Sequence, residues 1–192
     1  LGDIQEDLGM AVVERLGDAA SFSLCDVTQE DQVADLIAKA YEVNGQLDIM
    51  MNNAGIVGAR GPIDEIELIQ FQKTFDVLVS ATFLGMKHAA KKMKRQENGS
   101  IINLASTAGV SGGFGPHAYA AAKHAIVGLT KNAAAELCRF GIRVNCIAPS
   151  GVVTPLAAQA HLGDFEALDE IRETLALNSP LRGRAGTAED VA

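Results

Sequence analysis

A tyrosine and a lysine four residues apart form the most chemically suggestive pair in the sequence. Tyr119 and Lys123 are separated by three alanines, and residues at i and i+4 share one face of a helix. At an effective dielectric of about 20, an ammonium about 4 Å away stabilises a phenolate by about 4 kcal/mol. That lowers a phenol pKa from about 10 to about 7, so the tyrosine could act as a general acid or base. The pair alone is weak evidence, since such pairs also arise by chance on helices.

Other polar residues stand where short apolar runs end. Ser106 lies 13 residues before Tyr119, after one such run and before the glycine-rich loop 109–115. Comparable places are held by Asp3, Asp26, Asn52-Asn53 and Pro149. In open α/β sheets, ligands bind beyond the carboxyl ends of the strands. The sequence therefore predicts a ligand site built from these residues.

Alternating strands and helices are needed to position them. The apolar spacing predicts helices over 8–16, 33–41, 68–94, 119–140 and 165–175, and strands over 20–24, 47–51, 101–104 and 142–147. Thr28 and Thr187 are expected to cap helix starts, and Gly17 and Gly141 to end helices. This alternation predicts an α/β fold with a parallel sheet covered by helices on both faces.

Taken together, these motifs resemble the short-chain dehydrogenase/reductase family, of the compact single-domain type, over nearly the whole chain. The resemblance rests on Asp3 after a strand, Cys25-Asp26-Val27, Asn52-Asn53-Ala54-Gly55, Gly99-Ser100-Ile101 leading to Ser106, Tyr119-x-x-x-Lys123, and Asn145 through Thr154. Segments 115–119 and 141–146 look closest to the branch that contains xanthoxin and secoisolariciresinol dehydrogenases. The resemblance implies a doubly wound parallel sheet, Rossmann-like and three-layered, in one dinucleotide-binding and catalytic domain over 1–192.

The resemblance implies a nicotinamide-dependent oxidoreductase that acts on secondary alcohols or ketones. Its catalytic residues would be Ser106, Tyr119 and Lys123. Tyr119 would take the alcohol proton during oxidation or donate a proton to a ketone during reduction. Ser106 would hold the substrate oxygen near Tyr119, and Lys123 would lower the tyrosine pKa and bind the nicotinamide ribose. The hydride transfer itself belongs to the cofactor.

The cofactor that the sequence favours is NAD. A carboxylate at the end of the second strand of such a fold accepts hydrogen bonds from the adenosine ribose and repels a 2′-phosphate. Asp3 fits that role, and no lysine or arginine precedes Arg15; the alternative is that Asp3 only caps the following helix. The cofactor-binding residues implied by the resemblance are Asp3, Ile4, Asp26, Val27, Asn53, Ala54, Gly55, Tyr119, Lys123, Pro149, Gly151, Val152 and Thr154.

Two features depart from the family pattern. The family usually has an asparagine in the long helix that holds a water in a proton relay beyond Lys123, whereas this chain has Leu78. Leucine cannot hydrogen-bond, which predicts a slower enzyme or another water path. A glycine-rich fingerprint should also precede an acidic residue such as Asp3 by about 20 residues. We therefore expect the domain to be truncated at both ends, without the first strand with its phosphate loop and without the last strand.

Two further functions remain open. One is a catalytically impaired NAD-binding paralogue that serves as a scaffold or sensor, which Leu78 suggests and the retained Ser106, Tyr119 and Lys123 oppose. The other is a sugar-nucleotide epimerase or dehydratase, which shares Tyr-x-x-x-Lys but has a longer chain; the motif at 52–55 argues against it.

Composition bounds the partners. With 16 basic and 24 acidic residues, the net charge is −8, which disfavours nucleic acid and anionic membranes. No apolar run approaches the roughly 18 residues that span a bilayer. The cysteines and histidines lack metal-ligand spacing, so we expect no metal, and buried free thiols favour a cytoplasmic location.

The apolar segment 156–175 favours a hydrophobic substrate. The two long helices, which pair between subunits in the family, favour a homodimer or homotetramer.

Overall fold

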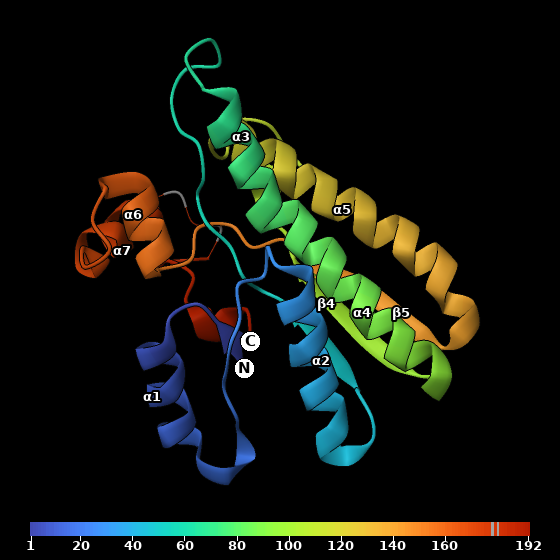
Figure 1. Cartoon of the computed structure of the whole chain (residues 1–192). Coiled ribbons are helices and arrows are strands. Elements are labelled where there is room, and N and C mark those ends of the chain that lie inside the picture. Colours follow the sequence, from blue (N-terminus) through green and yellow to red (C-terminus); the bar gives the residue numbers. More distant parts are fainter. Residues whose placement is uncertain (178, 180) are drawn as a thin grey trace.

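The computed structural model describes residues 1–177, 179 and 181–192 and arranges helices around parallel strands (Figure 1). The strands are β1 (Gly2–Asp3), β2 (Ser23–Leu24), β3 (Ile49–Asn52), β4 (Gly99–Leu104) and β5 (Ile142–Ile147). The helices are α1 (Glu6–Leu16), α2 (Glu30–Asn44), α3 (Leu68–Phe75), α4 (Ala81–Gln96), α5 (His117–Leu137), α6 (Pro155–Leu162) and α7 (Leu168–Leu177). The predicted parallel α/β fold is confirmed.

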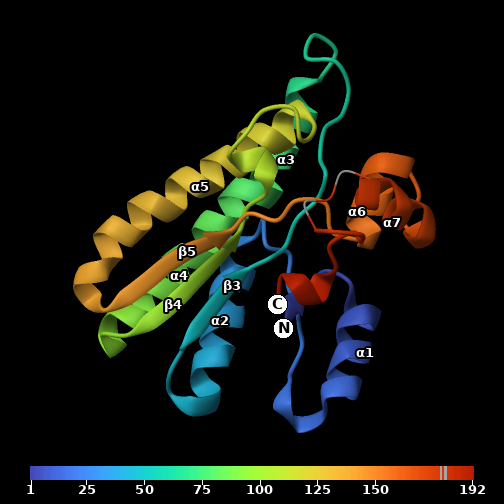
Figure 2. The same cartoon turned by 180° about the vertical axis from the view of Figure 1, so that it is seen from behind.

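The strands form two sheets rather than one. β1 pairs with β2, and β3, β4 and β5 lie side by side in that order, all parallel (Figure 2). Among the described residues, no strand joins β1 to β3. The division falls where we expect the missing first strand of the fold to lie. Within the larger sheet, parallel pairing brings the carboxyl ends of β3, β4 and β5 to one edge.

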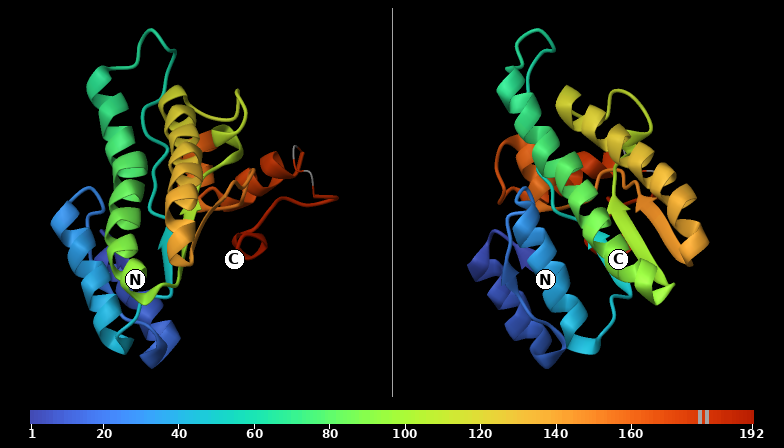
Figure 3. Two further views of the ribbon diagram at one scale, coloured as in Figure 1. Left: turned by 90° about the vertical axis from the view of Figure 1, so that its right-hand side faces the viewer. Right: turned by 45° about the vertical axis from the view of Figure 1, so that its right-hand side comes forward.

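The core lies between the larger sheet and the helices on one of its faces. α4 and α5 run alongside each other over that face, and α2 packs against α4 (Figure 3). The buried residues of this core are Val33, Ile37, Leu84, Met86, Met93, Ile101, Leu137, Ile142 and Val144, with Cys25, Leu47 and Ala89. On the other face of β3, Ile49 and Met51 are 61% and 47% exposed. Helices therefore cover the core face fully, and the outer face of β3 carries exposed apolar side chains.

Several helix boundaries differ from the prediction. The long helix expected over 68–94 is α3 and α4 joined by a π-helical segment, Asp76–Ser80. Thr28 does not cap α2, because its hydroxyl donates instead to Asp26 in the preceding turn. Helix α6 was not predicted; Thr154 caps it and Pro155 is its first residue, a favourable combination. Gly141 ends the 3₁₀ turn Cys138–Phe140 that follows α5, at φ +70°, as expected.

No helix within the described parts of the chain is long and apolar enough to cross a membrane. No group of three or more His, Cys, Asp or Glu side chains in those parts could hold a metal ion. The three cysteines are free. The expectation of buried thiols is confirmed for Cys25, whereas Cys146 is only half-buried and Cys138, just after α5, is exposed.

Candidate active site

Helix α5 carries the tyrosine and the lysine, and the structure buries the lysine. Lys123 is 5% exposed, and its Nζ donates a hydrogen bond of 2.6 Å to the carbonyl oxygen of Leu104, the last residue of β4. The same Nζ lies 5.4 Å from the centroid of the Tyr119 ring. The helical spacing thus places both side chains at the carboxyl end of β4, as the sequence predicts.

Ser106 lies two residues beyond the strand that receives Lys123. Its Oγ accepts from the N–H of Ala108 at 3.1 Å and caps the 3₁₀ turn Thr107–Gly109. The Ser106 side chain also lies beside that of Tyr119, close enough to lower the tyrosine pKa. Ser106, Tyr119 and Lys123 therefore meet at one place, although they come from a loop and a helix separated in sequence.

A close backbone approach holds the turn against the helix. A Cβ at Gly109 would lie 2.6 Å from the carbonyl oxygen of Lys123, so only glycine lets the turn after Ser106 rest directly on α5. From the sequence, Gly109 was identified only as part of a glycine-rich loop. A glycine beside a predicted catalytic serine is the signal that could have indicated close packing.

The electrostatics differ from the sequence-based expectation. Burial raises the pKa of Tyr119 above its ordinary value, and the nearby Ser106 side chain only partly offsets this effect. Burial also lowers the pKa of Lys123 to about 8. Desolvation of the ring therefore dominates the tyrosine pKa in this structure. The lowering of that pKa by the ammonium of Lys123 stays a prediction.

The residues predicted to contact the adenosine half of the cofactor lie at the ends of β1 and β2. The N–H of Cys25 donates to the carbonyl of Asp3 at 3.0 Å, which brings Asp3 beside Asp26. Asp3 is exposed, and its Oδ1 accepts from the N–H of Gln5 at 3.0 Å, so the carboxylate also supports the start of α1. Asp26 accepts from the backbone and hydroxyl of Thr28, which holds its pKa below the usual range.

The apolar residues that follow Asp3 and Asp26, Ile4 and Val27, differ in burial. Ile4 is 68% exposed, whereas Val27 is half-buried and packs against the main core. A surface contact is therefore open to Ile4, and Val27 has a structural role in addition to any contact with a ligand.

The remaining predicted contacts follow β3 and β5. Asn53, Ala54 and Gly55 are exposed directly after β3. Pro149 follows β5, and its carbonyl accepts from the N–H of Thr107 at 2.9 Å, next to Ser106. In the same segment, Gly151 lies against Leu175, Val152 bridges to Gly186, and Thr154 caps α6. The structure thus brings the Pro149 segment close to Ser106 and the other predicted catalytic residues.

The site residues fall into two groups, one on each sheet. Asp3 and Asp26 lie at the smaller sheet, and the predicted catalytic residues lie at the edge of the larger one. Helix α2 connects the groups, since Glu30 at its start binds Lys87 at 2.6 Å and His88 at 3.0 Å on α4.

Leu78 lies inside the π-helical segment and is 1% exposed. It packs with Ala105 and with Ala122 and Ile126 of α5. The hydroxyl of Thr82 donates to the Leu78 carbonyl at 2.7 Å. The position where the family usually has an asparagine is thus filled by an apolar side chain.

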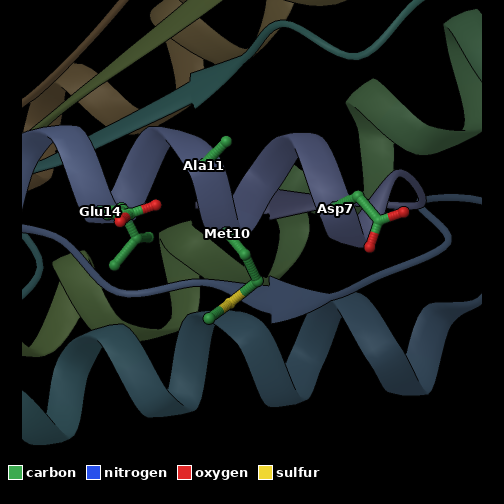
Figure 4. Close-up of a pocket in the computed structure, with 5 residues that line it drawn as sticks. Asp7, Met10, Ala11 and Glu14 are labelled. Atoms are coloured by element: carbon green, nitrogen blue, oxygen red, sulfur yellow. The ribbon is translucent and has the colours of Figure 1, made fainter.

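Two shallow depressions lie away from these residues. One is on α1 and is lined by Asp7, Met10, Ala11, Val13 and Glu14 (Figure 4). The other is lined by Ile63, Ile66, Leu68 and Phe71 near the start of α3. Neither contains a predicted site residue, and the second presents only apolar side chains.

A family model described as enoyl-(acyl carrier protein) reductase matches residues 1–192. The (+)-borneol dehydrogenase 2 of Salvia officinalis is 46% identical over 199 residues, covering 100% of this chain and 70% of that protein. The chain belongs to the short-chain dehydrogenase/reductase family. This is a family of oxidoreductases.

The branch suggested by the sequence is also confirmed. Xanthoxin dehydrogenase of Arabidopsis thaliana is 44% identical over 99% of this chain and 70% of its own length. Secoisolariciresinol dehydrogenase of Forsythia intermedia is 40% identical over 100% of this chain and 69% of its own length.

Solved structures of this family share the fold. Levodione reductase superposes with a TM-score of 0.85 at 33% identity, over 100% of this chain and 76% of that one. The NAD⁺-bound xylitol dehydrogenase gives 0.79 at 27% identity, over 100% of this chain and 78% of that one. ElxO with NADP bound gives 0.84 at 30% identity, over 99% and 76%. The neighbours include proteins bound to either nicotinamide cofactor.

Proposed function

We propose that this short-chain dehydrogenase/reductase transfers a hydride between NAD(H) and a hydrophobic secondary alcohol or ketone. The observation that carries the proposal is the cluster at the end of β4, where Lys123 binds the Leu104 carbonyl and the Ser106 side chain lies beside Tyr119. A phenol, a hydroxyl and an ammonium together can hold an alcohol oxygen and move its proton.

Each residue has a defined task. The Ser106 hydroxyl holds the substrate oxygen, and the Tyr119 hydroxyl takes its proton in oxidation or returns one in reduction. Lys123 stays oriented by the Leu104 carbonyl, with its charge near the ring. The bound nicotinamide supplies the acceptor or donor of the hydride.

The side chains near β1 support NAD as the cofactor. The exposed Asp3 carboxylate can accept hydrogen bonds from the two ribose hydroxyls and repel a 2′-phosphate. Asn53 to Gly55 and the segment with Pro149, Gly151, Val152 and Thr154 would line the ribose and nicotinamide. Ile4, Asp26 and Val27 would lie near the adenine.

NADH formation tests the proposed reaction. The chain is incubated with NAD⁺ and a panel of secondary alcohols, including borneol, with a primary alcohol and a polyol as comparisons. We expect turnover with apolar secondary alcohols and little with the polyol. Saturable NADH binding without turnover on any member of the panel would instead indicate the scaffold function.

Asp3→Asn is expected to relax the preference for NAD. The amide keeps the hydrogen bond to the Gln5 N–H and removes the charge that repels a 2′-phosphate. The ratio of kcat/KM for NAD to that for NADP should fall at least about tenfold, equivalent to about 1.4 kcal/mol. Asp7→Asn, at an exposed position on the first turn of α1, is the control and should leave the ratio unchanged. An unaltered ratio in Asp3→Asn would show that Asp3 only supports the start of α1 and does not select the cofactor.

Leu78→Asn tests the departure from the family pattern. If the missing amide limits proton transfer, kcat should rise severalfold. The free energy of unfolding should fall by about 2–4 kcal/mol, because a fully buried leucine is lost and an amide is buried in its place. Leu84→Asn, on α4, should destabilise the protein without raising kcat. No gain in Leu78→Asn would show that proton transfer uses another path.

The resemblance to the family also guides our proposal for the oligomeric state and the cellular location. Phe83 on α4 is 48% exposed, and an apolar helix face of this kind suits pairing of α4 and α5 with those of another copy. We propose a homodimer or homotetramer, active in the cytoplasm on a small-molecule substrate, with 1–192 acting as one domain.

A further inference from the structure

A hydrogen-bonded network of buried polar side chains lies beneath the catalytic cluster and has no part in the proposed proton transfer. Asn103 is 0% exposed and Thr130 is 4% exposed. The Asn103 Nδ2 donates to the Thr130 Oγ1 at 2.9 Å, and the Thr130 hydroxyl donates to the Ile126 carbonyl at 2.7 Å. A second donation from Asn103 Nδ2 reaches the Met86 sulfur at 3.1 Å. Both amide hydrogens of Asn103 are thus used inside the core.

The network extends to Asn52 at the end of β3, next to the predicted cofactor-binding segment 53–55. The Asn52 Nδ2 donates to the Asn103 Oδ1 at 2.8 Å, and the two residues are partners in the β3–β4 register. A Cβ at Gly85 would overlap the side-chain oxygen of Asn52, so the α4 backbone closes directly over it. Asn52 immediately precedes Asn53, the first of the exposed residues proposed to line the ribose.

Helix α5 is therefore attached to β4 at two points. Lys123 binds the carbonyl of Leu104, and Thr130 binds the side chain of Asn103, the preceding residue of the same strand. Residues seven apart lie within about 20° of each other around a helix and about 10 Å apart along it. One attachment would let the helix pivot, whereas two on the same face fix both its rotation and its position along the strand.

We infer that Asn103 and Thr130 are positioning residues that hold α5 so that Tyr119 and Lys123 face the substrate oxygen held by Ser106. The hydrogen bond between Asn103 and Asn52 also fixes the position of α5 relative to the segment 53–55. The effect of these residues on turnover depends on the proposed function, but their effect on the surroundings of Tyr119 does not.

Thr130→Val is the direct test, because valine keeps the shape and removes the hydroxyl. We expect kcat to fall about tenfold to hundredfold, with KM for NAD nearly unchanged, and Thr130→Ser to recover most of the loss. Thr74→Val is a matched control: Thr74 is 1% exposed, donates to the Gln70 carbonyl and accepts from the Ala59 N–H. It should lose similar stability while kcat is kept.

A second measurement needs no activity. The chain has two tyrosines and no tryptophan, so in a Tyr41→Phe background the tyrosinate absorbance reports Tyr119 alone. Loss of the Thr130 attachment should let water reach the ring and bring the Tyr119 pKa down toward its ordinary value, and Thr130→Ser and Thr74→Val should leave it raised. If Thr130→Val does not fold, Thr130→Ala is compared with Thr130→Ser.

The two measurements separate the failures. Absence of NADH binding and turnover in the unsubstituted chain would overturn the proposed function, while the titration would still decide the attachment. An unchanged Tyr119 pKa, or an effect of Thr130→Val no larger than that of Thr74→Val, would overturn the positioning role.

Discussion

Replacing Tyr119 with phenylalanine is expected to lower kcat by about 10²- to 10⁴-fold, the range that a positioned general acid or base contributes. The structure supplies the reason: the Tyr119 side chain lies beside Ser106, and its ring centroid is 5.4 Å from the buried ammonium of Lys123. Phenylalanine keeps the ring and its packing but cannot exchange a proton. The loss should therefore fall on kcat, and NADH affinity should stay within about twofold.

Tyr41→Phe is the matched control for this substitution. Tyr41 is the only other tyrosine of the chain, and its ring lies 4.4 Å from Lys92 Nζ on α4, away from Ser106. Both variants remove one phenolic hydroxyl beside a lysine. We expect Tyr41→Phe to keep kcat, with both free energies of unfolding within about 1 kcal/mol of the unsubstituted value. Equal activity of the two variants would contradict the proton-transfer role of Tyr119.

The structure reproduces the parts of the site that local spacing determines. Tyr119 and Lys123 share a helix face because they are four residues apart, and Ser106 follows a strand because an apolar run ends before it. The helix stop at Gly141 follows equally from local conformation, since it lies at φ +70°. Such features depend on the chain within a few residues, so a sequence carries them directly.

The features that the sequence did not reveal depend on tertiary register. The Leu104 carbonyl binds Lys123, but a backbone oxygen has no residue type to mark it. Asn103 meets Thr130 only once α5 is laid on β4, and Gly109 is constrained only by its contact with that helix. The direction of the Tyr119 pKa also depends on burial, which a pairwise estimate with Lys123 omits.

Lys123→Met is expected to separate activity from stability. Removing the ammonium should lower kcat by about 10²-fold or more, since the charge near Tyr119 is lost. Burial holds the pKa of Lys123 at about 8, so in the unsubstituted chain the activity that depends on the ammonium should also decline as pH rises through about 8. Lys131→Met, at an exposed position on the same helix, should leave both kcat and its pH profile unchanged.

Stability should respond to pH in the opposite direction. The folded-state pKa of Lys123 lies below its unfolded value of 10.5, so below about pH 8 both states carry the proton and the burial penalty applies in full. Between about pH 8 and 10.5 the unfolded state binds a proton that the folded state lacks, and the contribution of Lys123 to stability rises by about 3 kcal/mol. The Met variant lacks this contribution. Near neutral pH the two proteins should differ little, because the removed penalty is offset by about 1–3 kcal/mol for leaving the Leu104 carbonyl unpaired.

Denaturant unfolding at pH 7 and at pH 10 measures this difference. The free energy of unfolding of the unsubstituted chain should increase relative to Lys123→Met over that interval, while Tyr119 and the surface groups titrate in both proteins and cancel in the comparison. Parallel pH dependences would contradict this account and would mean that Lys123 is hydrated in solution. A lysine whose removal costs turnover but little stability at neutral pH is one that the fold keeps buried for its chemistry.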